Sequence, residues 1–273
     1  MQLKKTLLGG AAAALLLAAL APATASAAST IVVTPANTQG WSTADTRPGG
    51  AVNFVSDPTS PAPAGALQLI TDVTTTAKAQ YLHAANTPLS AVTDLSYYTR
   101  QVSAPFVSAD PSYQVIVWLN GTSGFSTLVF EPYQNPASGP VVTNVWQKWD
   151  VAAGLFWSTR TVTCSGGTVV GTSGGPATYT LAQINTYCPN AVVIGFGVNI
   201  GTNNPSYNVE TDLFNFNGTT YDFQLTNTPT DKDQCKDGGW KNFTDANGQP
   251  FKNQGQCEKF VKEARKHGGH EDD

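Results

Sequence analysis

Short hydrophobic runs separated by turn residues fill the chain from Thr30 to Asn227 and limit its possible folds most strongly. Apolar and polar residues alternate within many of these runs, as they do along a half-buried strand. Turn signals such as Pro48-Gly49-Gly50 and Asn120-Gly121 lie between them, and helical periodicity is almost absent. We therefore predict a mainly β fold, an antiparallel jelly-roll-like β-sandwich with one short helix. The expected strands are 51–55, 66–71, 79–83, 95–102, 113–119, 126–130, 142–151, 159–163, 192–200, 207–216 and 220–225.

Half of the tryptophans lie close together, between Gly139 and Cys164. Trp146, Trp149 and Trp157 occupy a predicted strand, turn and returning strand. Aromatic rings bury the most area per residue, so we expect the core to organise around this segment.

Three local signals interrupt or end the strand pattern. Thr180 and Gln183 form a capping-box pattern, which predicts a short helix that Pro189 stops. Asn217-Gly218 between two aromatic-rich runs predicts a two-residue hairpin turn that places Phe214 opposite Tyr221. A change of parity upstream predicts a β-bulge near Leu213. In the run 192–200, the glycines at 195 and 197 indicate either tight sheet packing or close approach of a ligand.

The four cysteines fall into two local pairs, Cys164 with Cys188 and Cys235 with Cys257. Four cysteines allow three connectivities, and proximity favours these two disulfides. Each would close a loop of roughly 25 residues and contribute ~3 kcal/mol in the chain-entropy model. A zinc site is the alternative, but it needs closely paired ligands that this sequence does not have.

The first 27 residues have the pattern of a signal peptide. Lys4 and Lys5 precede an apolar run from Leu7 to Leu20, and Ala25-Ser26-Ala27 is a small-x-small cleavage pattern. An uncleaved membrane helix is the alternative, but it needs ~20 apolar residues. No later stretch is long enough to span a bilayer. We therefore expect a secreted, extracellular protein without a membrane span after cleavage.

The composition changes after Leu225, which divides the mature chain. Residues 28–228 form the predicted sandwich, and residues 229–273 form a predicted cysteine module rich in Lys, Asp and Gly. Cys257, Phe260, Val261 and Ala264 repeat at helical spacing, so the module should end in a helix. A unit of roughly 45 residues needs a staple, which the second disulfide would supply.

Charge excludes several classes of partner. The chain has 15 Lys and Arg against 19 Asp and Glu, a formal net charge of −4. Nucleic acids and anionic membrane surfaces both select basic faces, so neither is an expected partner. A polar, weakly charged surface with aromatic residues is compatible with sugars, and equally with simple solubility.

Several segments together resemble secreted bacterial proteins with a lectin-like or carbohydrate-binding-module-like jelly roll. They are Val145-Trp146-Gln147-Lys148-Trp149-Asp150 with Gly154-Leu155-Phe156-Trp157-Ser158, Thr180-Leu181-Ala182 with Pro189-Asn190-Ala191, and Glu210-Thr211-Asp212-Leu213 with the run from Asn217 to Phe223. The tail is similar to a recurrent C-terminal module, with Cys235-Lys236-Asp237-Gly238-Gly239-Trp240 and Phe251-Lys252-Asn253-Gln254-Gly255-Gln256-Cys257. The resemblance implies the sandwich fold and no settled activity.

The sequence contains no complete catalytic set. Glu210-Thr211-Asp212 resembles part of a laminarinase-like glycosidase strand, but Asn215 stands where the acid would be. Glu210 and Asp212 are instead candidates for a structural calcium site, or are solvated carboxylates, and no other cofactor is expected. His83 lies in a predicted strand, and no serine has the elbow motif that a nucleophile would need.

Exposed aromatic rings are the remaining candidates, because the CH face of a sugar stacks on them. By strand parity or loop position these are Trp146, Trp157, Tyr97 and Tyr133. We therefore expect a non-catalytic binding or surface-associated module, with a polysaccharide, cell-wall polymer or other cell-surface component as partner. A coat or matrix protein without a small ligand is the first alternative, and a carbohydrate-active enzyme is the second.

Overall fold

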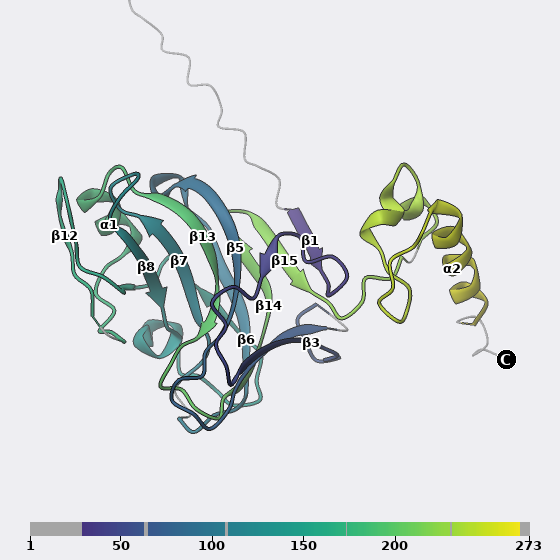
Figure 1. Ribbon diagram of the computed structural model, residues 1–273, viewed down its shortest axis with the longest axis horizontal. Helices are drawn as coiled ribbons and strands as arrows, with labels where there is room; N and C mark the ends of the chain where they lie inside the picture. The colour runs from purple at the N-terminus through teal and green to yellow at the C-terminus, as the bar shows by residue number, and fades with distance from the viewer. Residues whose placement is uncertain (1–28, 63–64, 107–108, 173, 230, 268–273) are drawn as a thin grey trace, which may run out of the picture.

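A computed structural model describes residues 29–62, 65–106, 109–172, 174–229 and 231–267, so the predicted signal peptide lies outside the described residues. Two β-sheets pack face to face around one hydrophobic core (Figure 1). One sheet contains β1 (Ser29–Val33), β3 (Gly50–Val55), β4 (Ala66–Thr71), β6 (Leu95–Ser103), β9 (Gln147–Asp150), β14 (Asn208–Phe216) and β15 (Thr219–Phe223). The other contains β2 (Trp41–Ser42), β5 (Ala79–Pro88), β7 (Ser112–Trp118), β8 (Phe125–Phe130), β10 (Trp157–Ser158) and β13 (Val192–Ile200).

The smaller elements complete the described chain. A two-stranded ribbon joins β11 (Val162–Cys164) to β12 (Gly167–Val169). The α-helices are α1 (Leu181–Tyr187) and α2 (Gln254–His267). Single 3-10 turns are η1 (Leu89–Ala91), η2 (Pro132–Gln134), η3 (Pro136–Ser138), η4 (Asp233–Cys235) and η5 (Gly239–Asn242). None of the described helices has the length and apolar character needed to cross a bilayer.

The predicted β-sandwich is confirmed, and strands that come late in the chain occupy the middle of both sheets. β13 lies between β5 and β7, and β14 pairs with β4 and β15 on one side and with β6 on the other. Every named strand pair is antiparallel except β1 with β15, which run parallel from Ser29↔Thr219 to Val33↔Phe223. Because the partners lie about 190 positions apart, no local pattern indicates this pairing.

The largest aromatic cluster surrounds Trp41, not the segment that the sequence favoured. Trp41 is 2% exposed, and its ring centroid lies 5.1–5.6 Å from those of Tyr81, His83, Phe196, Phe214, Tyr221 and Phe223. Trp149 is also fully buried and donates from Nε1 to Thr99 Oγ1 at 2.6 Å. Trp146 and Trp157 are only partly buried. Of the three tryptophans in the segment 139–164, only Trp149 is buried in the core, so the aromatic centre that was expected there lies at Trp41 instead.

The three local signals are confirmed. The capping box forms, with Thr180 Oγ1 accepting from the Gln183 amide and Gln183 Oε1 accepting from the Thr180 amide at 2.9 Å. Phe214 pairs with Tyr221 across a turn in which Asn217 and Gly218 both have positive φ, 52° and 87°. Leu213 has φ 44°, where the register between β14 and β6 shifts, so the bulge lies at the predicted residue.

Both predicted disulfides form and use all four cysteines. Cys164–Cys188 joins β11 to the end of α1 beside the sandwich core. Cys235–Cys257 joins η4 to α2. The second bridge lies in a separate small hydrophobic cluster with Phe251 and Val261, against which Trp240, Phe243 and Phe260 pack.

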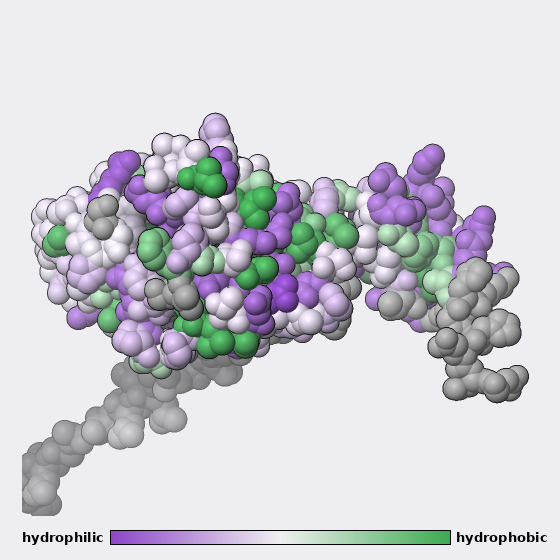
Figure 2. Space-filling model, turned by 90° about the horizontal axis from the view of Figure 1, so that it is seen from below, coloured by the Kyte–Doolittle hydropathy of each residue, from purple (hydrophilic) through white to green (hydrophobic). Residues whose placement is uncertain are grey.

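Hydrogen bonds connect the chain after the sandwich to the C-terminal residues. The Thr244 amide donates to Asn227 O at 2.7 Å, and the Asn227 side chain donates to Asn242 O at 2.7 Å, so Asn227 already contacts the tail. In Figure 1 the turns and α2 of this unit lie beyond the end of the sandwich, and Figure 2 shows strongly hydrophilic residues gathered on it. The division into two independently folding units stays a prediction.

The tail disulfide is expected to stabilise this small unit decisively. Cys257→Ser removes a bridge worth ~3 kcal/mol, more than a cluster of this size can replace. Limited proteolysis followed by mass mapping should then show rapid cleavage between residues 235 and 267, while the sandwich stays resistant. Cys164→Ser is the matched control, and it should expose the ribbon and α1 instead. An unchanged cleavage pattern in the Cys257→Ser variant would contradict the prediction.

Candidate functional site

A groove of about 680 Å³ lies on the outer face of the six-stranded sheet. Alternation along β7 creates it, because Tyr113, Val115 and Val117 point into the core and Gln114 and Ile116 point outward. Its floor is lined by Gln80, Leu82, Gln114, Ile116, Phe125, Thr127, Val129 and Asn199. Its rim includes Asp45, Arg47, Lys78, Phe106, Asp110, Glu131, Tyr133, Trp157, Thr159, Gly174, Asn203 and Tyr207.

The glycines of β13 lie on the outward parity of this sheet. A Cβ added at Gly197 would overlap the Tyr81 carbonyl and lie 2.7 Å from Leu82 Cδ2, and at Gly195 it would lie 3.3 Å from Ile116 Cδ1. Of the two readings that the sequence allowed, tight packing against β5 accounts for both positions. Leu82 and Ile116 therefore cover the middle of the floor with aliphatic side chains.

Two aromatic rings flank a carboxylate at the β8 edge of the groove. Trp157 Nε1 donates to Glu131 Oε2 at 2.8 Å, and Gln134 Nε2 donates to the same oxygen. Tyr133 lies two residues after Glu131, in η2, and is 44% exposed. Burial raises the pKa of Glu131, and the hydrogen bonds from Trp157, Gln134 and Tyr133 oppose that rise. Glu131 thus holds the Nε1 edge of the Trp157 ring in place and leaves the face of that ring partly exposed.

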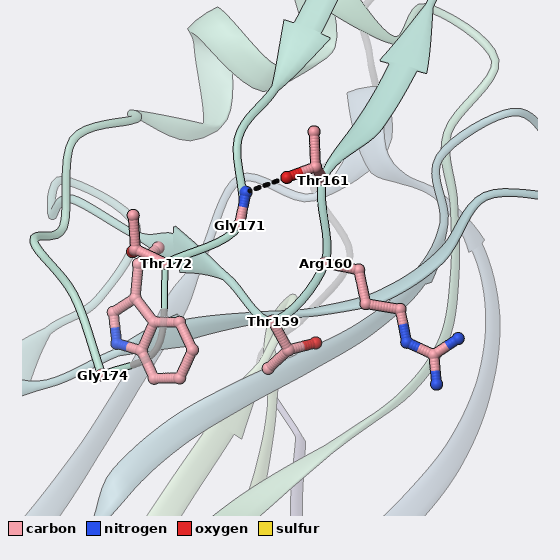
Figure 3. Close-up of a pocket in the computed structure, with 7 residues that line it drawn as sticks. Thr159, Arg160, Thr161, Gly171, Thr172 and Gly174 are labelled. Atoms are coloured by element: carbon pink, nitrogen blue, oxygen red, sulfur yellow. Dashed lines mark hydrogen bonds between the residues drawn. The ribbon is translucent and has the colours of Figure 1, made fainter.

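A smaller side pocket of about 360 Å³ continues from this edge. It shares Trp157, Thr159 and Gly174 with the groove. Figure 3 shows its walls, where the Gly171 amide donates to Thr161 Oγ1 at 3.2 Å. The two hollows therefore form one continuous surface around Trp157.

Sequence reasoning missed Phe106, a third aromatic residue of the groove. It lies in the loop after β6 and is 61% exposed. Phe106 lies outside the strands, so strand alternation does not single it out. A large apolar residue next to Pro105 was the available signal.

Of the four aromatic candidates, the structure brings Trp157 and Tyr133 together and places the other two elsewhere. Trp146 lies partly buried near the other sheet, where Nε1 donates to Asp57 Oδ2 at 3.0 Å and the Arg100 guanidinium lies 5.8 Å from the ring centroid. Tyr97 is fully buried, and its hydroxyl donates to Pro111 O at 2.7 Å. The prediction is wrong for Tyr97, because β6 turns its odd-numbered residues from Leu95 to Gln101 into the core.

Glu210 and Asp212, the candidate calcium ligands, have partners within the protein. Arg100 Nη2 lies 2.8 Å from Glu210 Oε2 and 3.2 Å from Asp57 Oδ2. Asp212 accepts from Ser60 Oγ at 2.6 Å and from the Phe223 amide at 2.9 Å. In the described part of the chain, no three His, Cys, Asp or Glu side chains gather as a metal site would need. The calcium ion stays a prediction without support from these contacts.

Asp110 is a second carboxyl group at the groove, near the Glu131 end. It is 7% exposed, and burial raises its pKa to about 7. Its Oδ2 accepts from Thr99 Oγ1, and its Oδ1 has no hydrogen-bond partner. Because Asp110 is buried, it affects the stability of the groove wall and is not an exposed contact for a ligand.

Comparisons with known proteins give no family. No protein-family model matches the sequence, and no curated protein matches it. Among solved structures, it is similar to a family 11 carbohydrate-binding module from Clostridium thermocellum in complex with a β-1,3-1,4-mixed-linked tetrasaccharide, with 11% identity and a TM-score of 0.37 over 65% of this chain and 86% of that one.

Two further solved structures match at similar levels. A second family 11 module, from a cellulosomal cellulase of the same organism, has 12% identity and a TM-score of 0.36 over 63% of this chain and 84% of that one. A β-1,2-glucanase from Parabacteroides distasonis has 9% identity and a TM-score of 0.38, over 74% of this chain and 25% of that one. Both binding modules and enzymes are thus among the matches, and neither kind decides the function here.

Proposed function

We propose that the protein is a non-catalytic module that binds a polysaccharide in the groove of the six-stranded sheet. The observation that carries the proposal is the pair of partly exposed rings, Trp157 and Tyr133, fixed around Glu131 at the edge of an open groove. Sugar rings are amphipathic: their CH faces pack on aromatic rings, and their hydroxyl groups bond to polar side chains. Gln114, Thr127 and Asn199 supply such polar groups on the floor.

The length of the groove favours a polymer over a single sugar. Phe125 and Glu131 both line it, and they are six residue steps apart along β8 and its end. At 3.3 Å per residue, this corresponds to about 20 Å. Several linked sugar units would therefore lie along the sheet, with Trp157 and Tyr133 at one side.

Trp157→Ala is expected to lower polysaccharide affinity about 30-fold, since a tryptophan that anchors an interface contributes about 2 kcal/mol. Isothermal titration against a panel of soluble glucans, xylans, mannans and uronans would measure it. Trp146→Ala is the matched control, because it too is a partly buried tryptophan whose Nε1 donates to a carboxylate, Asp57. The proposal fails if no polysaccharide binds, or if both variants bind as the wild type does.

A carbohydrate-active enzyme is the second candidate, because Asp110 and Glu131 are two carboxyl groups with raised pKa at one groove. Glycosidases use two carboxyl groups that both reach the scissile bond. Asp110 lines the groove but is only 7% exposed, so it presents little of its carboxyl group to a bound sugar. Release of reducing sugar from the polymer that binds best would favour the enzyme. Absence of any binding would favour a coat or matrix protein.

An extracellular location belongs to the same proposal. Disulfides persist mainly in oxidising compartments, and both bridges of this protein lie in hydrophobic surroundings. The predicted signal peptide, residues 1–27, would deliver the chain there.

A further inference from the structure

The cationic residues of the sandwich are distributed unevenly. Residues 28–228 contain ten carboxylates and five cationic residues, the latter being Arg47, Lys78, Arg100, Lys148 and Arg160. Arg47 and Lys78 line the groove, and Arg160 lines its side pocket. In an acidic domain, three of its five positive charges thus lie around one hollow.

Two of these charges are unpaired among the described residues. Lys78 Nζ lies 3.4 Å from Asp45 Oδ2, so this pair is neutral. Arg47 and Arg160 are exposed and form no ion pair with any described residue. The Arg160 guanidinium lies 5.0 Å from the centroid of Phe125, a floor residue of the groove. Figure 3 shows the Arg160 side chain extending away from Gly171 and Thr172.

The carboxylates around the groove leave this positive charge largely uncompensated. Asp45 forms an ion pair with Lys78, and Asp110 is buried. Glu131 is partly buried and accepts from Trp157 and Gln134. The accessible, unpaired charges are therefore the two guanidinium groups.

The two arginines lie at opposite ends of the groove. The backbone of Arg47 forms an isolated β-bridge with Lys78, next to the start of β5. Asn199 and Glu131 lie at the same end of the sheet. Arg160 lies against Phe125, at the start of β8. Six residue steps along β8 separate these ends, so the guanidinium groups are on the order of 20 Å apart along the strand direction.

We infer that the polysaccharide is anionic and carries uronate groups, which Arg47 and Arg160 bind at the two ends of the groove. Guanidinium groups bind carboxylates in a planar two-point geometry that neutral sugars do not match. The spacing requires a chain of several units, because one uronate does not reach both arginines. This inference rests on the proposed function and adds the chemical class of the ligand.

The test compares one polymer with and without its charges. Polygalacturonate and alginate are probes with carboxylates, and their methyl esters are neutral counterparts with the same backbones. The wild type should bind at least one acidic polymer about 25-fold more tightly than its ester at 50 mM salt, since two partly exposed ion pairs of about 1 kcal/mol each are expected. Because the Debye length is ~8 Å at 0.15 M ionic strength, this preference should shrink as salt increases.

Charge removal should act only on the acidic polymer. Arg47→Gln and Arg160→Gln are each expected to weaken acidic binding about fivefold, as loss of a partly exposed ion pair of about 1 kcal/mol implies. The double variant should bind acid and ester equally. Lys148→Gln is the control, since Lys148 lies in β9 of the other sheet, 5.9 Å from the Tyr98 ring centroid.

The outcomes separate the two proposals. If neutral polymers bind as well as acidic ones and Trp157→Ala abolishes that binding, the carbohydrate function stands and the uronate inference is overturned. Equal effects of Arg47→Gln, Arg160→Gln and Lys148→Gln would overturn it as well. If no polymer binds, both proposals fail. Thermal melts of each variant show that it is folded before its affinity is compared.

Discussion

Trp41→Ala is expected to lower the free energy of unfolding by about 4 kcal/mol, in the range measured for large aromatic residues cut to alanine in cores. Trp41 is 2% exposed, and six rings surround it at 5.1–5.6 Å. These rings come from β5, β13, β14 and β15, so they cannot collapse together without moving both sheets. Since small domains have only 5–15 kcal/mol of stability, a large fraction should be lost.

Urea unfolding followed by circular dichroism would measure this loss. Trp146→Ala is the control, because Trp146 is partly buried outside this cluster, and its change should stay near 1 kcal/mol. Equal losses in the two variants would contradict the central role of Trp41. The same outcome would restore the segment 139–164 as the organising part of the core.

The sandwich is expected to become less stable as pH rises from 4 to 8. Burial raises the pKa of Asp110 and of Asp212 to about 7, from a value of 3.8. A carboxyl group with a raised pKa binds its proton more tightly in the folded state, so folding is favoured below pH 4 and loses that advantage as pH rises through 7. Burial raises the pKa of Glu131, Glu210 and Asp222 in the same direction.

Effects of similar size are expected at Asp110 and Asp212, because burial raises both pKa values to about 7. For Asp110, a pKa that burial raises from 3.8 to about 7 corresponds to at most about 4 kcal/mol between pH 4 and pH 8. Asp110→Asn removes the titration, so its unfolding free energy should change less with pH, and the variant should gain stability over the wild type at pH 8. Urea midpoints measured between pH 4 and 8 test this. A wild-type stability that increases steadily over this interval would contradict the assignment.

Features encoded by neighbouring residues were predictable from the sequence. The capping box at Thr180, the turn at Asn217-Gly218, the bulge at Leu213 and both disulfides each depend on residues within about 25 positions. Turn and cap chemistry acts through hydrogen bonds between such neighbours, so one sequence is sufficient to identify it.

Features that depend on distant partners were not predictable. Trp41 lies in a strand of two residues, too short for alternation to show, and it is placed by β5. Odd and even positions of a strand lie on opposite faces, but the alternation does not say which face is buried. For this reason both Tyr97 and Trp157 were predicted to be exposed rings. The groove combines side chains from separate loops and strands, including Phe106 and Arg47, which only the folded sheet brings to one hollow.

The central positions of β13 and β14 have a consequence for how the protein is made. Both strands follow residue 191, and each holds together strands that are synthesised much earlier, such as β4, β5 and β7. A nascent chain stopped before Val192 therefore contains only fragments of each sheet, and its contacts with high sequence separation form last. We therefore expect such a chain to stay unfolded until β13 and β14 have been synthesised. An unfolded chain can pass through a translocation channel, and a protein exported by the predicted signal peptide would have to be unfolded at that stage.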